Sequence, residues 1–412
     1  MKILIVAFYD DNFGDMLIRT CFVQLMKVVL DNLGIDSNDY TVDTMELKYP
    51  DKEKIREANL VIFPGGGLFG LSYLGFLDYV ETVVSETELN NIPVIFSSLG
   101  VNNMSVNEDI SQEYRLYRLL EKKCIKAISA RDGIEVIKKY DGGLHDIIEV
   151  CDPVVWAKYV YSKDLKEKNN SARIIGLNVV RGGLFKSNGI AWNAKKEEKY
   201  LLNAIDLIKQ MGFDYRLFTN GQFLDSHELY YFSDKHDILT EKVIIPDTSR
   251  EVVKAINDVN CVLGIRMHSS IISYGLGIPS INLGWNPKVY EFYNHIHKSG
   301  RVFSVEEWNN EMLSKMIPEL LNDHEYSIDR DYLMTLYGFL YRTFNLLFDR
   351  NLSEGKCFAF EMIEKQLLDM SVPTSEDDTD LRIKIRNGTK AFDRLYIRDL
   401  QKKKEIKKLK GQ

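Results

Sequence analysis

The strongest constraint on the fold is a regular alternation of short apolar runs with amphipathic segments, which occurs twice along the 412 residues. Between the first two runs, the apolar residues of Asp15–Leu33 recur at helical spacing, and Gly34 ends the pattern. Strands that alternate with helices form parallel sheets with helices on both faces. In the first half the expected strands are Ile3–Ala7, Thr41–Leu47, Leu60–Phe63, Pro93–Ser98, Ile125–Ser129 and Asp146–Val150.

A second alternating series begins after the polar segment 161–171. Its expected strands are Ile174–Val180, Tyr215–Thr219, Val243–Pro246, Cys261–Ile265 and Ser280–Leu283. We therefore expect an α/β protein with two doubly wound, Rossmann-like domains, residues 1–160 and 171–300, that face a cleft. The strand signals fade after residue 301, and residues 306–321 and 331–368 have helical patterns. This part divides into a helical extension (301–370), an acidic linker (371–380), expected to be mobile, and a basic amphipathic tail (381–412).

The net charge of −7 is unevenly spread. Residues 381–412 hold 12 Lys and Arg against 3 Asp and Glu, a net charge of +9, so residues 1–380 carry −16. An acidic body argues against nucleic acid as a partner. Apolar residues among the cations of 389–412 are typical of a helix on an anionic membrane surface, although a solvated or coiled-coil tail fits the composition equally well.

Neither an export signal nor a membrane span is expected. The longest uncharged runs, 60–77 and 269–287, are interrupted by Gly and Pro. The five cysteines are widely spaced and form no pattern of metal ligands, so most are expected to be buried thiols in a reducing compartment. We therefore expect a cytoplasmic protein without a metal site.

Candidate site residues follow the strands, because ligands bind beyond the carboxyl ends of parallel strands. Asn12 and Asp15 open the first expected helix, where their side chains can cap the helix or bind sugar hydroxyls. The run PGGGLFG (64–70) contains G-x-G-x-x-G, but the next strand ends without the acid that a dinucleotide requires. A nicotinamide-dependent oxidoreductase is therefore disfavoured, and Gly66 lies in a turn that lets a ligand approach the backbone.

The run GIRMHSS (264–270) places Arg266 and His268 at the end of another expected strand. Both side chains lie on one side if the chain stays extended. Arginine offers a planar fork for a carboxylate or phosphate, and histidine transfers protons near neutral pH. Alone, the pair would be interpreted as structural, but its position favours a site. Arg181 and Lys288 follow neighbouring strands and add cations.

Taken in order, these motifs resemble those of the polysaccharide pyruvyl transferase family. The resemblance extends from residue 12 to about residue 301 and does not cover the acidic linker or the basic tail. It consists of N-x-G-D (12–15), the glycine turn (65–67), SLG (98–100), ARD (130–132), DP (152–153), R-x-H (266–268), GIP (277–279) and the loop that bears Lys288.

The resemblance implies a GT-B-like fold and a transferase that needs no cofactor. It would move a pyruvyl group from phosphoenolpyruvate to two hydroxyls of a sugar in a cell-surface polysaccharide or its lipid-linked precursor, forming a cyclic ketal. Carried over, Arg266 would bind the donor's carboxylate or phosphate and His268 would act as general acid or base, which makes them the catalytic pair. Our own candidates are Arg181, Lys288 and Ser269 for the donor, and Asn12, Asp15, Gly66 and Asn102 for the acceptor.

A lipid-linked acceptor would suit docking of residues 389–412 at the inner face of the membrane. Two alternatives remain open. One is a glycosyltransferase of the same architecture that uses a nucleotide-sugar. The other is a non-catalytic, membrane-tethered glycan-binding protein.

Overall fold

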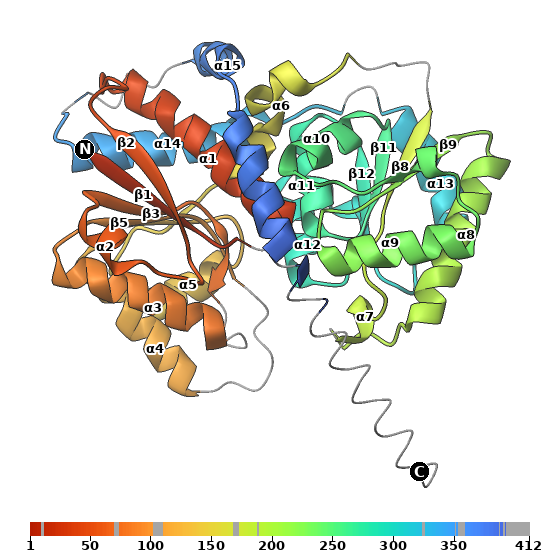
Figure 1. Cartoon of the computed structure of the whole chain (residues 1–412), viewed down its shortest axis with the longest axis horizontal. Coiled ribbons are helices and arrows are strands. Elements are labelled where there is room, and N and C mark those ends of the chain that lie inside the picture. The colour runs from red at the N-terminus through yellow and green to blue at the C-terminus, as the bar shows by residue number, and fades with distance from the viewer. Residues whose placement is uncertain are drawn as a thin grey trace, which may run out of the picture.

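The computed structural model describes residues 1–9, 12–69, 74–101, 110–167, 173–187, 189–323, 326–350, 352, 359–386, 388–389 and 392. Within them the chain forms two parallel β-sheets that lie side by side, each covered by helices (Figure 1). Each expected strand is present, with ends that differ by a few residues. The two short strands Gly66–Phe69 and Val302–Phe303 were not expected from the sequence.

The first sheet has the strand order β2-β1-β3-β5-β6-β7, with β4 beside β5. Along β1, Ile3 and Ile5 face the core under α1 (Phe13–Asn32), and Leu4 and Val6 face the core on the opposite side of the sheet. Apolar side chains on both faces explain why this strand is a continuous apolar run. The strands are β1 (Lys2–Ala7), β2 (Thr41–Glu46), β3 (Leu60–Phe63), β4 (Gly66–Phe69), β5 (Val94–Val101), β6 (Ile125–Ala130) and β7 (Ile148–Glu149).

Helices α2 (Lys52–Arg56), α3 (Leu74–Leu89), α4 (Ile110–Leu120) and α5 (Ile134–Asp141) are contributed by the connections of this first sheet. The strand order reverses between β1 and β3, so the loops after these two strands diverge. Such a reversal leaves a crevice where ligands bind in open α/β sheets.

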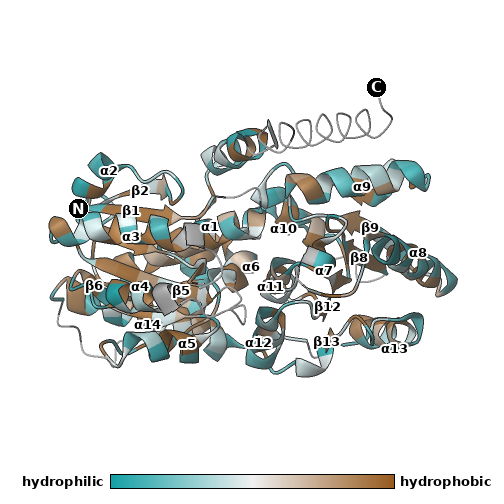
Figure 2. Cartoon of the chain, turned by 90° about the horizontal axis from the view of Figure 1, so that it is seen from below, coloured by the Kyte–Doolittle hydropathy of each residue, from teal (hydrophilic) through white to brown (hydrophobic). Residues whose placement is uncertain are grey.

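The second sheet has the order β10-β9-β8-β11-β12-β13 and reverses between β8 and β11. Its strands are β8 (Ile174–Asn178), β9 (Asp214–Phe218), β10 (Val243–Ile244), β11 (Cys261–Gly264), β12 (Ser280–Leu283) and β13 (Val302–Phe303). Its helices are α7 (Leu184–Ser187), α8 (Ala194–Gln210), α9 (Phe223–Lys235), α10 (Ser249–Asn257), α11 (Met267–Gly275), α12 (Pro287–His295) and α13 (Asn310–Leu321). The apolar residues lie inside and the polar faces of the helices lie outside (Figure 2).

One apolar cluster continues from the first half into the second through α1, α10 and α11. The contact is close at Gly275, where an added Cβ would lie 2.8 Å from the carbonyl oxygen of Val154, and at Gly221, where it would lie 2.1 Å from the ring of Phe13. Real Cβ atoms do not approach this closely, so both positions require glycine for the halves to meet. Because the halves share a core, they are firmly packed against one another.

The region expected as one helical extension, residues 301–370, is divided between the two halves. Strand β13 joins the second sheet, and α13 packs against α8. Helix α14 (Arg330–Leu347) instead returns to pack on α1, as does α15 (Phe360–Asp369). The sequence shows that these segments are helical but not which half each apolar face covers.

The expectation of a mobile acidic linker at 371–380 is wrong, because residues 374–386 form a helix between the two halves. It is the unlabelled blue helix at the centre of Figure 1. Ile383 is buried, and three of the four acidic residues, Glu376, Asp377 and Asp380, are ion-paired instead of solvated. The pairs are Glu376 and Asp380 with Arg19, Asp377 with Arg250, Lys384 with Asp247, and Arg386 with Glu46. Residues 393–412 of the basic tail lie outside the described residues.

In the described part of the chain, no helix combines the length and apolar character needed to cross a bilayer. Within the same part, no group of three or more His, Cys, Asp or Glu side chains could hold a metal ion. Cys21, Cys124, Cys151 and Cys261 are buried free thiols, as expected, and Cys357 lies outside the described residues.

Candidate functional site

The amino end of α1 lies at the junction of the two halves, directly after the first strand. Asn12 caps the helix, because its Oδ1 accepts a hydrogen bond from the Gly14 amide at 3.3 Å. The Asn12 amide group also donates to Asp15 Oδ2 at 3.1 Å. The Phe13 amide donates to the Asn220 carbonyl of the second half at 3.0 Å. Helix capping explains Asn12 locally, and the interdomain bond holds Asp15 against the second half.

His268 lies in the first turn of α11 and reaches across this junction. An added Cβ at Gly14 would lie 2.3 Å from its ring, so the glycine of N-x-G-D makes room for the imidazole. The ring is buried, and its Nε2 has no hydrogen-bond partner among the described residues. Burial lowers the pKa of His268 well below its ordinary value, and the charges of Arg131 and Lys288 act in the same direction. The imidazole is therefore neutral at neutral pH and has a nitrogen available to a ligand.

The ARD motif supplies a buried ion pair beside this imidazole. Arg131 and Asp132 are 6% and 5% exposed, and Arg131 Nε lies 3.3 Å from Asp132 Oδ2. Asp132 Oδ1 also accepts from the Val101 amide at 2.6 Å. An added Cβ at Gly100, in the SLG motif, would lie 2.8 Å from Asp132 Oδ2. The glycine therefore allows β5 to approach the ion pair.

The DP motif holds the other side of the same guanidinium. Asp152 accepts from Arg131 Nη1, and its second oxygen accepts from the Val154 amide at 2.8 Å, which starts the 3₁₀ turn Pro153–Trp156. Two carboxylates thus fix the orientation of Arg131. Arg131 and Asp132 were not among the predicted site residues, although their motif was part of the family resemblance and identifies them.

Lys288 lies in the first turn of α12 and reaches the same centre. Burial lowers the pKa of Lys288, while Asp132 and Asp15 raise it and Arg131 lowers it. These couplings show that Lys288, Asp15 and the ARD pair lie close together. The structure therefore brings together the predicted residues His268, Lys288, Asp15 and Asn12.

Arg266 is placed differently from the sequence prediction. It is the extended residue before α11, whereas His268 is already helical, so the alternation that should have aligned the two side chains does not apply. The guanidinium makes a two-bond ion pair with Asp225, at 2.9 Å to Oδ2 and 2.8 Å to Oδ1, and also donates to Gln222. The Ser269 hydroxyl donates to the Arg266 carbonyl at 2.6 Å, which stabilises the helix start. Both side chains are engaged within the protein.

Arg181 lies among acids instead of near the imidazole cluster. Its amide donates to Asp225 Oδ1 at 2.9 Å, and the next two amides donate to Glu228 (3.0 Å) and Glu197 (2.9 Å). The Arg181 charge also lowers the pKa of the Glu197 carboxyl, against the larger raising effect of burial. Acidic neighbours therefore offset the charge of Arg181.

The last two predicted residues belong to the first half. Gly66 lies in β4 with φ of 100° and is buried beside Leu99 of β5. The preceding Gly65 has φ of 142°, and a Cβ there would lie 3.0 Å from Ile18, so the turn needs glycine. Asn102 lies outside the described residues.

Solved structures with similar folds include a UDP-GlcNAc 2-epimerase. The enzyme of Methanocaldococcus jannaschii, solved with UDP-GlcNAc and UDP, has a TM-score of 0.50 and 14% identity, over 85% of this chain and 100% of that chain. S. aureus MnaA, solved with UDP, has a TM-score of 0.51 and 10% identity, over 87% of this chain and 100% of that chain. These likenesses show the two-domain GT-B-type fold that the sequence predicted.

No curated protein matches the sequence. The sequence model of the family described as polysaccharide pyruvyl transferase matches residues 12–287. This range begins at the cap of α1 and ends next to Lys288, so it contains each motif that surrounds His268. The chain belongs to the polysaccharide pyruvyl transferase family.

Proposed function

We propose that the protein transfers a pyruvyl group from phosphoenolpyruvate to two hydroxyls of one sugar, in a cell-surface polysaccharide or its lipid-linked precursor. The product is a cyclic pyruvate ketal, and no cofactor takes part. One observation carries the proposal: His268 is buried, its Nε2 has no partner among the described residues, and the charges of Arg131 and Lys288 act on it where the family's motifs converge.

The cations around His268 suit a compact polyanion as the ligand. Arg131, Lys288 and Arg266 all lower the pKa of His268, and Asp132 opposes them. A carboxylate and a phosphate bound here would be stabilised by charges that the fold has already oriented. Lys288 and Arg131 are the proposed donor-binding cations. Arg266 acts at longer range, because its guanidinium is held by Asp225.

The neutral imidazole suits a general base. Nε2 of His268 accepts the proton of one sugar hydroxyl while that oxygen attacks the carbon of phosphoenolpyruvate that bears the phosphate. In the same step the electron pair of the double bond moves to the neighbouring methylene carbon, which takes the proton passed on by the imidazolium and becomes a methyl group. The carbon–oxygen bond to phosphate then breaks, the second hydroxyl closes the ketal, and its proton leaves with the phosphate. General acid–base catalysis of this kind contributes about 10²–10⁴-fold.

The reacting sugar is proposed to lie against Asn12 and Asp15. Their carboxylate and amide groups face the same centre as Lys288, and both can accept or donate hydrogen bonds to hydroxyls. Gly66 and Asn102 stay proposed acceptor-binding residues, as the sequence predicted. Holding a diol and the donor together supplies much of the remaining rate enhancement.

The test is acceptor-dependent release of phosphate from phosphoenolpyruvate. The panel contains galactose-, mannose- and N-acetylmannosamine-containing lipid-linked acceptors, with nucleotide-sugars as control donors. His268→Ala should lower turnover by about 10²–10⁴-fold, and the exposed His227→Ala should not change it. Folded His268→Ala with near-normal turnover, or transfer from a nucleotide-sugar alone, would contradict the proposal.

Membrane docking through residues 389–412 is a separate part of the proposal, motivated by the basic charge of the tail. Because the helix 374–386 is part of the folded body, the chain should be truncated after residue 386. Anionic vesicles should co-sediment with the full chain and not with the truncated one. Equal binding of both would remove the docking hypothesis.

A further inference from the structure

A pocket lies at the point where the strand order of the second sheet reverses. Asn178, Val179 and Val180 line it from the end of β8, and Ile265 lines it from the end of β11. Its space, including the mouth and the open solvent there, is about 470 Å³. Crevices at such a reversal are the usual ligand sites of open α/β sheets. No residue of this pocket was predicted from the sequence.

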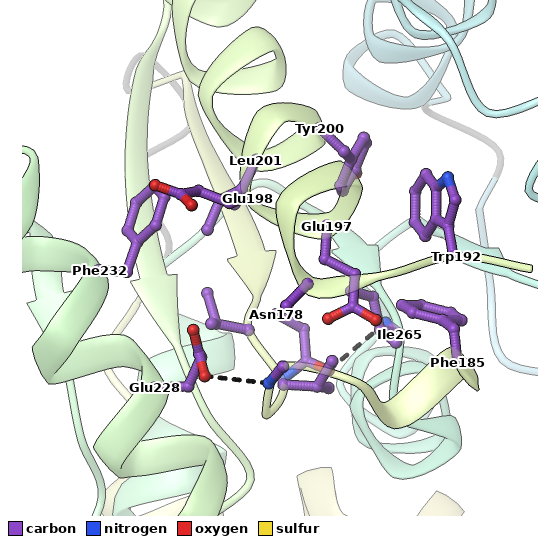
Figure 3. A pocket seen from close by; sticks show the side chains of 14 residues that line it. Asn178, Phe185, Trp192, Glu197, Glu198, Tyr200, Leu201, Glu228, Phe232 and Ile265 are labelled. Atoms are coloured by element: carbon purple, nitrogen blue, oxygen red, sulfur yellow. Dashed lines mark hydrogen bonds between the residues drawn. The ribbon is translucent and has the colours of Figure 1, made fainter. Parts of the chain in front are cut away.

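Aromatic side chains form one wall of this pocket. Phe185 and Trp192 are in edge contact, with ring centroids 5.0 Å apart, and Tyr200 lies 5.6 Å from Trp192. Figure 3 shows Phe185 and Trp192 on one side, Phe232 and Glu228 on the other, and the Glu197 carboxylate between them. Trp192 and Tyr200 are half-buried, so the pocket opens to solvent.

Two carboxylates supply the hydrogen-bonding groups. Glu197 Oε2 accepts from the Gly183 amide at 2.9 Å, and Glu228 Oε2 accepts from the Gly182 amide at 3.0 Å. Glu197 Oε1 is buried and has no partner among the described residues. Gly182 cannot be larger without disturbance, because an added Cβ would lie 3.0 Å from Glu228. The glycine loop therefore fixes both carboxylates and leaves one oxygen of Glu197 for a ligand.

This combination selects the chemistry of the ligand. Glu197 and Glu228 repel phosphate and carboxylate groups, so phosphoenolpyruvate and the diphosphate of a nucleotide-sugar do not suit the pocket. Carboxylate oxygens accept hydrogen bonds from hydroxyls. Aromatic rings pack against the apolar C–H faces of a flat ligand. A neutral pyranose ring offers both kinds of surface.

The pocket is connected to the proposed reaction centre through the backbone. The buried Asn178 at its floor accepts a hydrogen bond from the Arg266 amide at 2.9 Å. Ile265 lines the pocket, and His268 follows three residues later. The Arg266–Asp225 ion pair contacts both regions: Asp225 Oδ1 accepts from the Arg181 amide, next to Gly182 of the pocket, and the charge of Arg266 lowers the pKa of His268.

We propose that this pocket binds a neutral sugar unit of the acceptor glycan, next to the unit that receives the pyruvyl group. The inference rests on the proposed function for its substrate class. It places part of the acceptor on the second domain, whereas the sequence analysis assigned the acceptor to the first domain alone.

The test uses direct binding, without phosphoenolpyruvate. Saturation-transfer NMR on the full-length protein is recorded with the methyl glycosides of galactose, glucose and mannose, and with uridine and tetramethylammonium as probes of other chemistry. At least one glycoside should bind, and Trp192→Ala and Glu197→Gln should each weaken it at least tenfold. Tyr231→Ala, an exposed aromatic on α9, should leave binding unchanged. If Trp192→Ala does not fold, the near-isosteric Glu197→Gln carries the test.

Each outcome separates this proposal from the proposed function. Glycoside binding that both variants weaken, without any phosphate release in the transferase assay, supports the pocket and contradicts the transferase. Acceptor-dependent phosphate release with an unchanged acceptor KM in both variants overturns the pocket alone. Preferential binding of uridine or of tetramethylammonium also overturns it.

Discussion

Replacing Asp380 by alanine should destabilise the whole protein, although Asp380 belongs to none of the motifs around His268. The side chain is fully buried in the helix 374–386. Its Oδ2 accepts from the Ser249 amide at 2.8 Å and from the Ser249 hydroxyl, and its Oδ1 lies 3.9 Å from the guanidinium of Arg19. Arg19 is 2% exposed and belongs to α1, whereas Ser249 begins α10. The carboxylate therefore joins both halves.

The magnitude follows from these contacts. Removing one partner of a buried, hydrogen-bonded charge pair costs about 3–5 kcal/mol. Arg19 keeps its second partner, Glu376, so we expect the lower end, a loss of about 3 kcal/mol in the free energy of unfolding. Asp380→Asn retains an oxygen for the two bonds from Ser249, so its loss should be smaller, about 1 kcal/mol. Asp378→Ala, an exposed carboxylate on the same helix, should cost less than about 0.5 kcal/mol.

Urea unfolding at pH 7.5 would measure these differences, followed by circular dichroism and by tryptophan fluorescence. Coincident transitions from the two probes are needed before a single free energy is assigned to a two-domain chain. The order should be wild type and Asp378→Ala, then Asp380→Asn, then Asp380→Ala. If Asp380→Ala and Asp378→Ala unfold at the same urea concentration, the helix does not join the two halves as the contacts indicate.

Three further predictions concern the imidazole of His268. Gly14→Ala would place a Cβ 2.3 Å from the ring, so the ring must shift, and the rate of phosphate release should fall by about 100-fold. The control Gly300→Ala, with open space around it, should not change this rate. Lys288→Met removes a charge that lowers the pKa of His268, so the pKa measured by NMR titration should rise. The KM for phosphoenolpyruvate should also rise at least tenfold. An unchanged pKa would show that Lys288 does not act on His268. The pKa of His268 is near 6.5 in the unfolded chain and lower in the folded protein. Acidification below about pH 6.5 should therefore lower the free energy of unfolding of wild type more than that of His268→Asn. Urea unfolding between pH 5 and 8 measures this difference, and equal losses in both proteins would refute it.

The strands were predictable because most of them are buried on both faces. Leu60–Phe63 is an uninterrupted apolar run, Ser280–Leu283 is buried throughout, and the bounds of both agree with the sequence prediction. Strand β4 was missed because it lies within the glycine motif, where the pattern indicates a turn. Strand β13 has two residues, too few for any periodicity.

The helix 374–386 could not be predicted from its own composition. Four of its first seven residues are acidic, a pattern typical of a solvated segment. Its partner Arg19 lies hundreds of residues away in the sequence, and its partner Arg250 lies over a hundred residues away. Charge composition alone does not show whether an acid is paired with a distant arginine, and only the fold brings these residues together.

The position of the candidate site was predictable, but the direction of its side chains was not. The rule that ligands bind beyond parallel strands located His268 and Lys288 correctly at the junction. It could not show that α11 begins at Met267, which turns His268 towards Gly14 and leaves Arg266 facing Asp225. The start of the helix between the two residues therefore directs His268 to the candidate site and Arg266 to a neighbouring loop.

Arg266 and Arg181 were predicted as site residues for the donor, but the charges around them indicate a different role. Both are matched by acids, the first by Asp225 and the second by the carboxylates around its loop. At His268 the charges of Arg131 and Lys288 lower the pKa of the imidazole, and Asp132 opposes them. We therefore expect an anionic donor to bind beside Arg131 and Lys288 and to be repelled from the acidic pocket. Charge alone thus separates an anionic donor from a neutral sugar, which is the discrimination that a transferase with two such substrates requires.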